Sequence, residues 1–592
     1  MRTSSHASLN VLSIALGFVV ACMTSVALPA CKKPASDSSE GSSGGAGTTS
    51  TRSGDGKKAR VVELVFAYGS EKMAWLEDAI ATFNDSPEAR TDSFTIRIKG
   101  VAQGSGTALT DIVEGVVKPH LWSPASDFYR ALLTRAWTAK VGAAGSVADI
   151  ASDSKPLVLS PVVIAMWKPM AEALGWPDKP IGWSDILALS ADKQGWASRG
   201  HAEWGQFKLG HTHPEFSNSG LLSVLAEAYA AAGKTTGLAA EDLASAQTRK
   251  FLEEIEGSII HYGKSTGFFA DKMLQRGPSY LSAAVVYENL VIDSYKRPEY
   301  RDREMDLVAI YPKEGTFWIE NPMVILDAPW VTEEHKKAGA AFRDYLLGKP
   351  MQTRAMTEYG FRPSDPAIAI AAPLDAEHGV DPKQPTTLLD VPDSNVLDGA
   401  LETWKQVKKT VDLVFVFDRS GSMSGAPLRN AKQGALDFMS LLDPRDRVAI
   451  VMFNHKVESP IRDPVPVGAN RAALQKKIDS TFADGGTALY DAIAAAHGKL
   501  KGAAARDAKR IFALVVMTDG LDESSSMKYE ALTRAIAPPA EQAIAVKLFT
   551  IAYGNAADKN ALAAIAEAGG GASFTGDLGS IRQIYRDLAA FF

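Results

Sequence analysis

The chain has 592 residues, of which 46% are hydrophobic and 22% are charged, and its formal net charge is −6. This length exceeds the size at which a single hydrophobic core stops growing, so we expect two or more domains. The 63 basic against 69 acidic residues lack the excess that neutralises phosphates, so we expect no nucleic-acid partner. The only cysteines are Cys22 and Cys31, which excludes zinc–thiolate sites and thiol catalysis in the rest of the chain.

The amino terminus has the pattern of an export signal. Arg2 precedes a stretch from 7 to 30 that contains no charged residue, as in a signal peptide. The stretch ends in the letters LPAC at Cys31, which resemble a bacterial lipobox, whose cysteine is acylated and becomes the new amino terminus. Cys22 is an alternative acylation site. An uncleaved membrane helix and a plain secretory signal remain alternative interpretations. We expect 1–31 to be a lipoprotein signal peptide with Cys31 lipidated.

A polar stretch follows this segment. From 35 to 56, 16 of 22 residues are Gly, Ser or Thr, a composition that cannot bury a core. We expect 32–59 to be a flexible tether with a reach of roughly 25 Å. The chain is therefore expected to be exported to the cell envelope and held on a membrane by its lipid. Lys32, not an aspartate, follows the cysteine, which by resemblance to the known sorting rule implies the outer membrane in a Gram-negative cell.

The distribution of tryptophan divides the rest of the chain. All eleven tryptophans lie at or before Trp404, and none lies in the last 188 residues. Between 375 and 398 the chain contains three prolines and no sustained hydrophobic period, which is typical of a linker. We predict a first domain at 60–373, a linker at 374–409 and a second domain at 410–592.

The second domain alternates strand and helix patterns. Short apolar runs predict buried strands, at 412–418, 447–454, 511–519 and 546–554. Amphipathic stretches between them predict helices at 428–443 and 488–501. Continuous apolar strands separated by such helices specify a parallel sheet covered on both faces. In such a sheet the ligand site lies at the carboxyl ends of the strands.

Hydroxyl and carboxylate side chains gather at those ends. The first strand leads into Asp418, Ser420 and Ser422, a later strand leads into Asp519, and Thr487 precedes a helix. Mg²⁺ prefers about six oxygen ligands and keeps several waters. We expect the two serines and the threonine to bind the ion, with the aspartates supplying charge directly or through water.

These five residues resemble the metal-ion-dependent adhesion site of the von Willebrand factor type A family, with its D-x-S-x-S, T and D pattern. The resemblance covers about 410–592 and implies a doubly wound Rossmann-like domain that binds Mg²⁺, or Mn²⁺ or Ca²⁺. It also implies a protein partner whose acidic residue fills an open position of the ion. For either motif alone, a glycine and serine turn or a helix cap is the better interpretation.

Enzyme motifs are absent from the sequence. A nucleophile elbow needs G-x-S-x-G, but Met423 occupies the central position between Gly421 and Gly425. The segment YGKS at 262–265 lacks the glycine spacing of a phosphate loop. His211 and His213 stand in the letters HTHP, which favour a polar loop over a metal site. We therefore expect no enzyme activity.

The first domain also alternates strands and helices, with a strand predicted at 61–70, a helix at 72–84 and a strand at 93–102. A glycine-rich turn at 103–107 then leads into a helix, whose first N–H groups can bind an anion or simply form a cap. The order of these segments, continued by PLVLSPVVIAMWKPMAEALGWP at 156–177 and AAVVYENLVI at 283–292, resembles the two-lobed extracellular solute-binding proteins of bacterial ABC importers.

This second resemblance implies a periplasmic-binding-protein-like fold with a ligand cleft between two lobes. The residues that it places in the cleft are Ser70, Ser105, Gly106 and Ser123, with Ser160 and Tyr287 as further candidates. The segment HLW at 120–122 departs from the acidic, small-residue run of the oxyanion-binding group, which leaves the solute open.

Together these features predict a surface-anchored bacterial binding protein of α/β class. In the first hypothesis the metal site recognises a protein or matrix partner, and the solute-binding-like domain acts as a sensor or scaffold. The alternative is the substrate-binding component of an ABC importer that captures a small solute, such as an oxyanion.

Overall fold

The computed structural model describes residues 60–592, except 143–148, 261, 505, 508, 538–545, 555 and 577–580. The expected signal peptide, the lipidation site Cys31 and the tether lie outside the described residues. Residues 59–592 belong to one structural unit, which is mixed α/β as expected.

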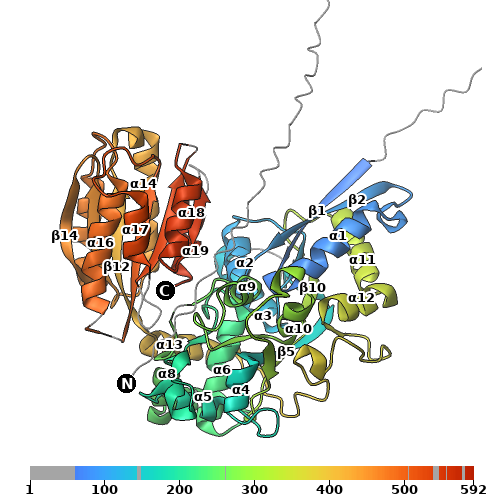
Figure 1. Ribbon diagram of the computed structural model, residues 1–592. Helices are drawn as coiled ribbons and strands as arrows, with labels where there is room; N and C mark the ends of the chain where they lie inside the picture. Colours follow the sequence, from blue (N-terminus) through green and yellow to red (C-terminus); the bar gives the residue numbers. More distant parts are fainter. Residues whose placement is uncertain are drawn as a thin grey trace, which may run out of the picture. The chain divides into compact units, whose positions relative to one another are not determined.

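The first lobe of the amino-terminal module is built on a five-stranded sheet. Its strand order is β2 (Phe94–Ala102), β1 (Arg60–Tyr68), β3 (Leu121–Ser123), β10 (Pro322–Ile325) and β4 (Asp153–Pro156). β1 is parallel to β2 and β3, whereas β10 is antiparallel to both of its neighbours. The helices of this lobe are α1 (Met73–Asp85), α2 (Ser105–Glu114), α3 (Phe128–Val141), α11 (Glu333–Leu347) and α12 (Lys349–Tyr359) (Figure 1). The predicted strands and helix of this region agree with β1, α1 and β2 to within two residues.

The second lobe has its own sheet, centred on the long strand β5. The order is β11 (Arg362–Pro363), β5 (Val158–Trp167), β7 (Ala283–Tyr287) and β6 (Leu209–Gly210), and β8 (Leu307–Ile310) and β9 (Trp318–Ile319) also pair with β5. Its helices are α4 (Lys168–Ala173), α5 (Trp183–Ser190), α6 (Asn218–Ala232), α7 (Ala240–Ala244), α8 (Ala246–Glu256), α9 (Thr266–Arg276) and α10 (Glu288–Lys296). The chain passes from the first lobe to the second between β4 and β5 and returns at β10, so two lobes share one chain as expected.

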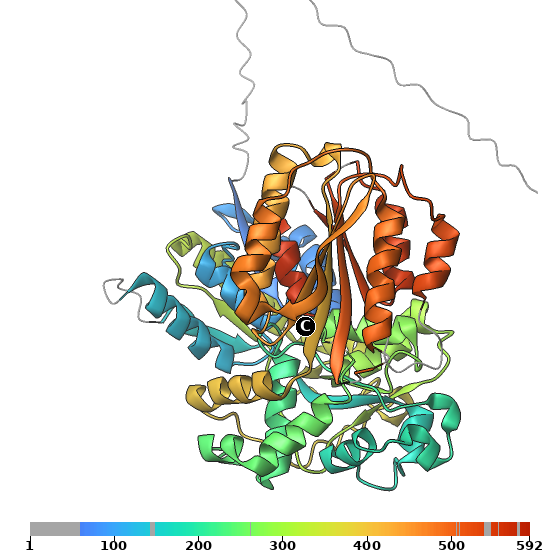
Figure 2. The same cartoon turned by 90° about the vertical axis from the view of Figure 1, so that its left-hand side faces the viewer.

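The carboxy-terminal module contains a six-stranded sheet with helices on both faces (Figure 2). Its order is β14 (Val457–Pro466), β13 (Arg447–Phe453), β12 (Thr410–Asp418), β15 (Arg510–Thr518), β16 (Lys547–Tyr553) and β17 (Ser573–Gly576). The helices are α14 (Ala426–Leu441), α15 (Val467–Asp479), α16 (Leu489–Ala504), α17 (Tyr529–Ile536), α18 (Lys559–Ala568) and α19 (Ile581–Ala589). All neighbouring strands are parallel except β14, which is antiparallel to β13. β14 contains Pro460, Pro464 and Pro466, and proline is tolerated on such an edge strand.

Part of the segment expected to be a linker, 374–409, is packed structure, whereas many of its residues before 394 are exposed. It contains the helix α13 (Ser394–Val407), which contacts α6, α7 and α8 of the second lobe and buries Trp404 completely. Earlier in the segment the N–H of Leu389 donates to the carbonyl of Thr316 at 2.9 Å. The sequence did not predict this packing, because its prolines indicate a linker and a helical period of buried residues begins only at residue 394.

Candidate functional site

The carboxyl ends of two neighbouring parallel strands bring the predicted acidic residues together. β12 ends at Asp418 and β15 ends at Thr518, and the strands pair in register up to Phe417 and Met517. Asp519 follows β15 directly, so both carboxylates lie at the same edge of the sheet. In α/β sheets this is the edge at which ligands bind.

A chain of hydrogen bonds links four of the five predicted metal ligands. The N–H of Ser420 donates to Asp418 Oδ1 at 2.7 Å, and the hydroxyl oxygens of Ser420 and Ser422 lie 3.0 Å apart. Ser422 Oγ donates to Asp519 Oδ1 at 2.7 Å. The second oxygen of Asp418 accepts from Thr518 Oγ1 at 2.5 Å. Sequence reasoning did not identify Thr518, although its position at the end of a strand beside Asp418 is a usable signal.

Thr487 reaches the same edge from the loop before α16. The N–H of Ala488 donates to the carbonyl of Asn454 at 2.7 Å, which fixes the end of this loop beside β13. A methyl group placed on Gly520 would lie 3.4 Å from Thr487 Oγ1 and 3.7 Å from Ser422 Oγ. The threonine and serine hydroxyls therefore border the same small volume.

The loop that carries Thr487 requires glycine at position 485. Gly485 has φ of +74°, and a Cβ there would lie 2.2 Å from Nδ1 of His455. Its carbonyl accepts from the N–H of Gly421 at 2.8 Å. This bond ties the threonine loop to the serine loop, so the hydroxyls of both are held together.

Both aspartate side chains are buried, so their charged forms are poorly solvated. Burial raises the pKa of Asp418 to about 6, and the nearby Asp519 carboxylate also raises it. Burial likewise raises the pKa of Asp519. A cation between two such carboxylates would favour their charged forms. The donor set consists of oxygen atoms only, which fits a hard divalent ion such as Mg²⁺ better than a softer transition metal.

In the amino-terminal module, the predicted cleft residue Ser70 connects the two lobes. Ser70 Oγ donates to Ser265 Oγ at 2.9 Å, and the N–H of Gly267 in α9 donates to Ser70 Oγ at 3.0 Å. The hydroxyl thus caps a helix of the opposite lobe. In this conformation it forms part of the closure between the lobes, and its donor is not available to a ligand.

The glycine-rich turn before α2 is also engaged across the lobes. The N–H groups of Gly106 and Thr107 both donate to the carbonyl of Phe216 at 3.1 Å. A Cβ at Gly106 would lie only 2.1 Å from the carbonyl oxygen of Glu215. This corrects the expectation that Gly106 offers a free N–H to an anion. Its glycine is needed because the opposite lobe's backbone approaches so closely.

Of the other predicted cleft residues, Ser105 is engaged and Ser123 is not, and two residues that were not predicted, Ser126 and Asn218, also keep unused polar atoms. Ser105 Oγ accepts from the N–H of Ala125 at 3.1 Å. Ser123 Oγ, Ser126 Oγ and Asn218 Oδ1 are buried and have no hydrogen-bond partner among the described residues. Because such unpaired groups each cost about 1–3 kcal/mol, they mark the positions where the polar groups of a bound molecule would be most useful.

A buried ion pair that the sequence did not reveal lies beside these residues. Lys72 is 0% exposed, and its ammonium donates to the Glu71 carboxylate and, at 2.8 Å, to Asn321 Oδ1. Burial lowers the pKa of Lys72, while Glu71 raises it. Asn321 has φ of +43°, a conformation that concentrates at functional sites. From sequence alone, Lys72 is indistinguishable from an exposed residue at a helix start.

The remaining cleft candidates, Ser160 and Tyr287, are engaged within the second lobe. Ser160 Oγ donates to Asn289 Oδ1 at 3.2 Å, and Tyr287 Oη accepts from Asn218 Nδ2 at 2.9 Å. A cavity of about 30 Å³ lies against Ser70 and Asn289. A cavity of this size holds about one water molecule, which excludes a solute from it.

The model of the bacterial extracellular solute-binding protein family matches residues 64–362, just over half of the chain. The chain belongs to this family of bacterial extracellular solute-binding proteins. A second model, that of the von Willebrand factor type A domain, matches residues 412–586. Both resemblances expected from the sequence are confirmed, and so is the fold class. The two matches fall within the solute-binding domain and the carboxy-terminal module described above.

Several known proteins are similar to parts of this chain at low identity. Two curated proteins of Mycobacterium tuberculosis, both uncharacterised, are 24% identical over 391 residues, which cover 63% of this chain and 53% of theirs. The chain thus spans about half the length of these relatives. The solved sulfate-binding protein of Mycobacterium tuberculosis is 19% identical, covering 52% of this chain and 88% of its own, with a TM-score of 0.35. A solved von Willebrand factor type A protein of Catenulispora acidiphila is 22% identical, and the match covers 31% of this chain and 42% of that protein, with a TM-score of 0.27.

Membership of the solute-binding family indicates export and a small-molecule ligand. Within the described residues, no helix combines the length and the apolar character that a membrane crossing needs.

Proposed function

We propose that this protein is an exported envelope protein that recognises a protein partner through a divalent ion in its von Willebrand factor type A domain. The observation that carries the proposal is the convergence of five oxygen-bearing residues, two acidic and three hydroxylic, at one sheet edge. Ser420, Ser422 and Thr487 would hold the ion, and Asp418 and Asp519 would supply the negative charge. A lipid on Cys31 would keep the protein on the membrane.

A bound Mg²⁺ would supply positive charge to an acidic side chain of the partner. The chain's own residues shape that position. Ser420 is 1% exposed, whereas Gly421 and Ser422 of the short turn Gly421–Met423 are exposed. The partner would therefore approach from the Ser422 side of the edge, and the solute-binding domain would act as a sensor or scaffold.

The test is metal-dependent capture. Residues 59–592, immobilised without a histidine tag, are exposed to envelope extracts of the source cells in Mg²⁺ or in EDTA. The proposal expects proteins that bind wild type in Mg²⁺ only and that are not retained by Thr487→Val. Thr533→Val, at a half-buried position of α17, is the matched control and should behave as wild type. Retention of the same proteins by all variants in EDTA would contradict the proposal.

The closed interior of the solute-binding domain supports a second candidate, the substrate-binding component of an importer. Ser123, Ser126 and Asn218 leave polar atoms unused inside it, and Lys72 adds a buried charge. These groups would bind a small polar solute on opening and reclosing of the lobes. A thermal-shift screen with sulfate, phosphate, amino acids and sugars tests this, because a ligand at 100 times its Kd stabilises by about 2.7 kcal/mol.

Two results separate the candidates. A solute that stabilises wild type but not Asn218→Ala, together with permease and ATPase genes beside this one, would favour transport. If no compound of the screen stabilises the protein, the scaffold role is favoured.

A further inference from the structure

Three ionisable side chains meet in the interior of the second lobe, apart from the sites above. His211 follows β6, Glu227 lies in α6 and Glu256 ends α8. All three are 0% exposed, and one nitrogen or carboxylate oxygen of each lies within 4.8 Å of those of the others. His211 Nε2 and Glu256 Oε1 are 3.0 Å apart. The expectation of a polar loop at His211 is therefore wrong, because the loop is buried.

The remaining polar atoms of these side chains are oriented by neighbours. His211 Nδ1 lies 2.7 Å from the carbonyl oxygen of the next residue. Since a carbonyl only accepts, Nδ1 carries the proton, and in the neutral ring Nε2 keeps its lone pair. Tyr262 Oη donates to Glu256 Oε2 at 2.6 Å, and Ser223 Oγ donates to Glu227 Oε1 at 2.8 Å. Outer partners of this kind hold metal ligands in place in known sites.

One carboxylate oxygen of the cluster lacks any partner. Glu227 Oε2 is buried and has no hydrogen-bond partner among the described residues. The same part of the chain gives Glu227 no ion pair and gives Glu256 only the one with His211. A nearby cation is Lys409, whose charge interacts with that of Glu256. Its ammonium donates to the carbonyl of Ile259 at 3.0 Å. His211 Nε2 and Glu256 Oε1 share one proton at 3.0 Å, which leaves Glu227 as a second buried carboxyl group without an ionic partner, and burying such a group is costly.

We propose that His211 Nε2, Glu227 and Glu256 bind one divalent transition-metal ion of the zinc type. One neutral imidazole and two carboxylates exactly balance a charge of +2, and the mixed nitrogen and oxygen donors suit Zn²⁺ better than Mg²⁺. Binding displaces the proton between His211 and Glu256. A water or a second carboxylate oxygen completes the coordination.

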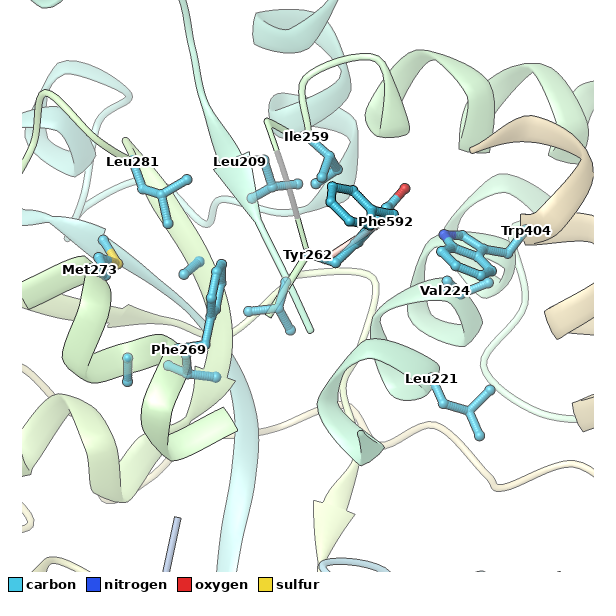
Figure 3. Packing of buried hydrophobic residues seen from close by; sticks show 14 of the residues in the cluster. Leu209, Leu221, Val224, Ile259, Tyr262, Phe269, Met273, Leu281, Trp404 and Phe592 are labelled. Atoms are coloured by element: carbon cyan, nitrogen blue, oxygen red, sulfur yellow. The ribbon is translucent and has the colours of Figure 1, made fainter. Parts of the chain in front are cut away.

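The ion would connect the loop after β6 with α6 and α8. These two helices support α13, the helix that precedes the carboxy-terminal module. α13 packs against both α6 and α8. The ring centroids of Trp404 in α13 and Tyr262 are 5.3 Å apart, and Figure 3 shows both side chains with Leu221 and Val224 of α6 in the same buried region. Because the site is closed to solvent, its role is structural, and it is independent of the proposed adhesion function.

The test uses untagged residues 59–592, loaded with Zn²⁺ and then passed through a desalting column. We expect one tightly held Zn²⁺ per chain by elemental analysis. Glu227→Gln keeps the size of the side chain and removes its charge, and we expect it to weaken Zn²⁺ binding on the order of 100-fold. Thr533→Val, which removes a threonine hydroxyl that belongs to neither proposed metal site, should retain the zinc. Equal zinc in Glu227→Gln and wild type would overturn the proposal.

A measurement on the wild type alone protects the test against misfolded variants. Crystals of the zinc-loaded protein should show an anomalous peak at the zinc edge about 2.0–2.1 Å from His211 Nε2. A wild-type structure without a peak there, in which His211 and Glu256 simply share a proton, would refute the site.

Discussion

Replacing Thr487 by valine should abolish tight Mg²⁺ binding and leave the metal-free fold nearly unchanged. The substitution keeps the branched shape and removes one hydroxyl, which borders the same volume as Ser422 Oγ. We expect the affinity to fall about 100-fold, at the upper end of the losses seen when a metal site's supporting contacts are removed. At an ion concentration of 100 times the wild-type Kd, the stabilisation would then fall from about 2.7 to about 0.4 kcal/mol.

Asp418→Ala should behave differently, because Asp418 also braces the site without the ion. It accepts the N–H of Ser420 and the hydroxyl of Thr518. Its removal leaves two donors unpaired, which costs about 2–6 kcal/mol of stability in the metal-free protein. Relief of the repulsion from Asp519 offsets part of this cost. A simple charge-repulsion argument from the sequence would predict no loss of stability, and the two hydrogen bonds explain the difference.

Titration calorimetry with Mg²⁺ and thermal unfolding with and without EDTA measure both effects on residues 59–592. We expect Thr487→Val to lose Mg²⁺ binding at unchanged metal-free stability, and Asp418→Ala to lose both Mg²⁺ binding and metal-free stability. Thr533→Val serves as the control for loss of a threonine hydroxyl elsewhere in the module. Wild-type Mg²⁺ affinity in Thr487→Val would refute the placement of the ion.

Three further predictions concern other parts of the chain. Palmitate labelling in a bacterial host should mark wild type but not Cys31→Ser; loss of the label only in Cys22→Ser would move the acylation site. Ser70→Ala removes two hydrogen bonds between the lobes, so small-angle scattering should detect a larger radius of gyration in the absence of solute, and an unchanged radius would show that other contacts keep the lobes closed. Trp404→Ala, at a fully buried ring, should cost about 3–5 kcal/mol in denaturant unfolding; a loss below 1 kcal/mol would mean that α13 contributes little to the second lobe.

The carboxy-terminal module was predictable because its sheet is buried on both faces. Strands of this kind appear as continuous apolar runs, and the predicted strand at 412–418 differs from β12 only at its start. The end of each run then locates the polar residues. Since parallel strands end at one edge, Asp418 and Asp519 could be brought together without knowledge of the packing.

The cleft of the solute-binding domain was harder to predict because its hydrogen bonds join distant segments. The turn at Gly106 has the pattern of an anion site, but its N–H donates to Phe216, a residue of the other lobe. A sequence pattern shows that a donor exists and does not show which acceptor reaches it. The same limit applies to Lys72, whose burial depends on Asn321 at the far end of the domain's sequence.

The connection between the two modules is short enough to have mechanical consequences. α13 ends at Val407 and β12 begins at Thr410, so only two residues separate a helix fixed on the second lobe from the central sheet. A connection of this length cannot absorb a displacement of α13. Asp418 lies at the opposite end of β12, about 27 Å away for nine residues. The module is also held to the first lobe, because Arg586 of α19 pairs with Asp111 and Glu114 of α2. A solute that moves one lobe against the other would thus pull on the module at these two attachments, which both lie away from Asp418.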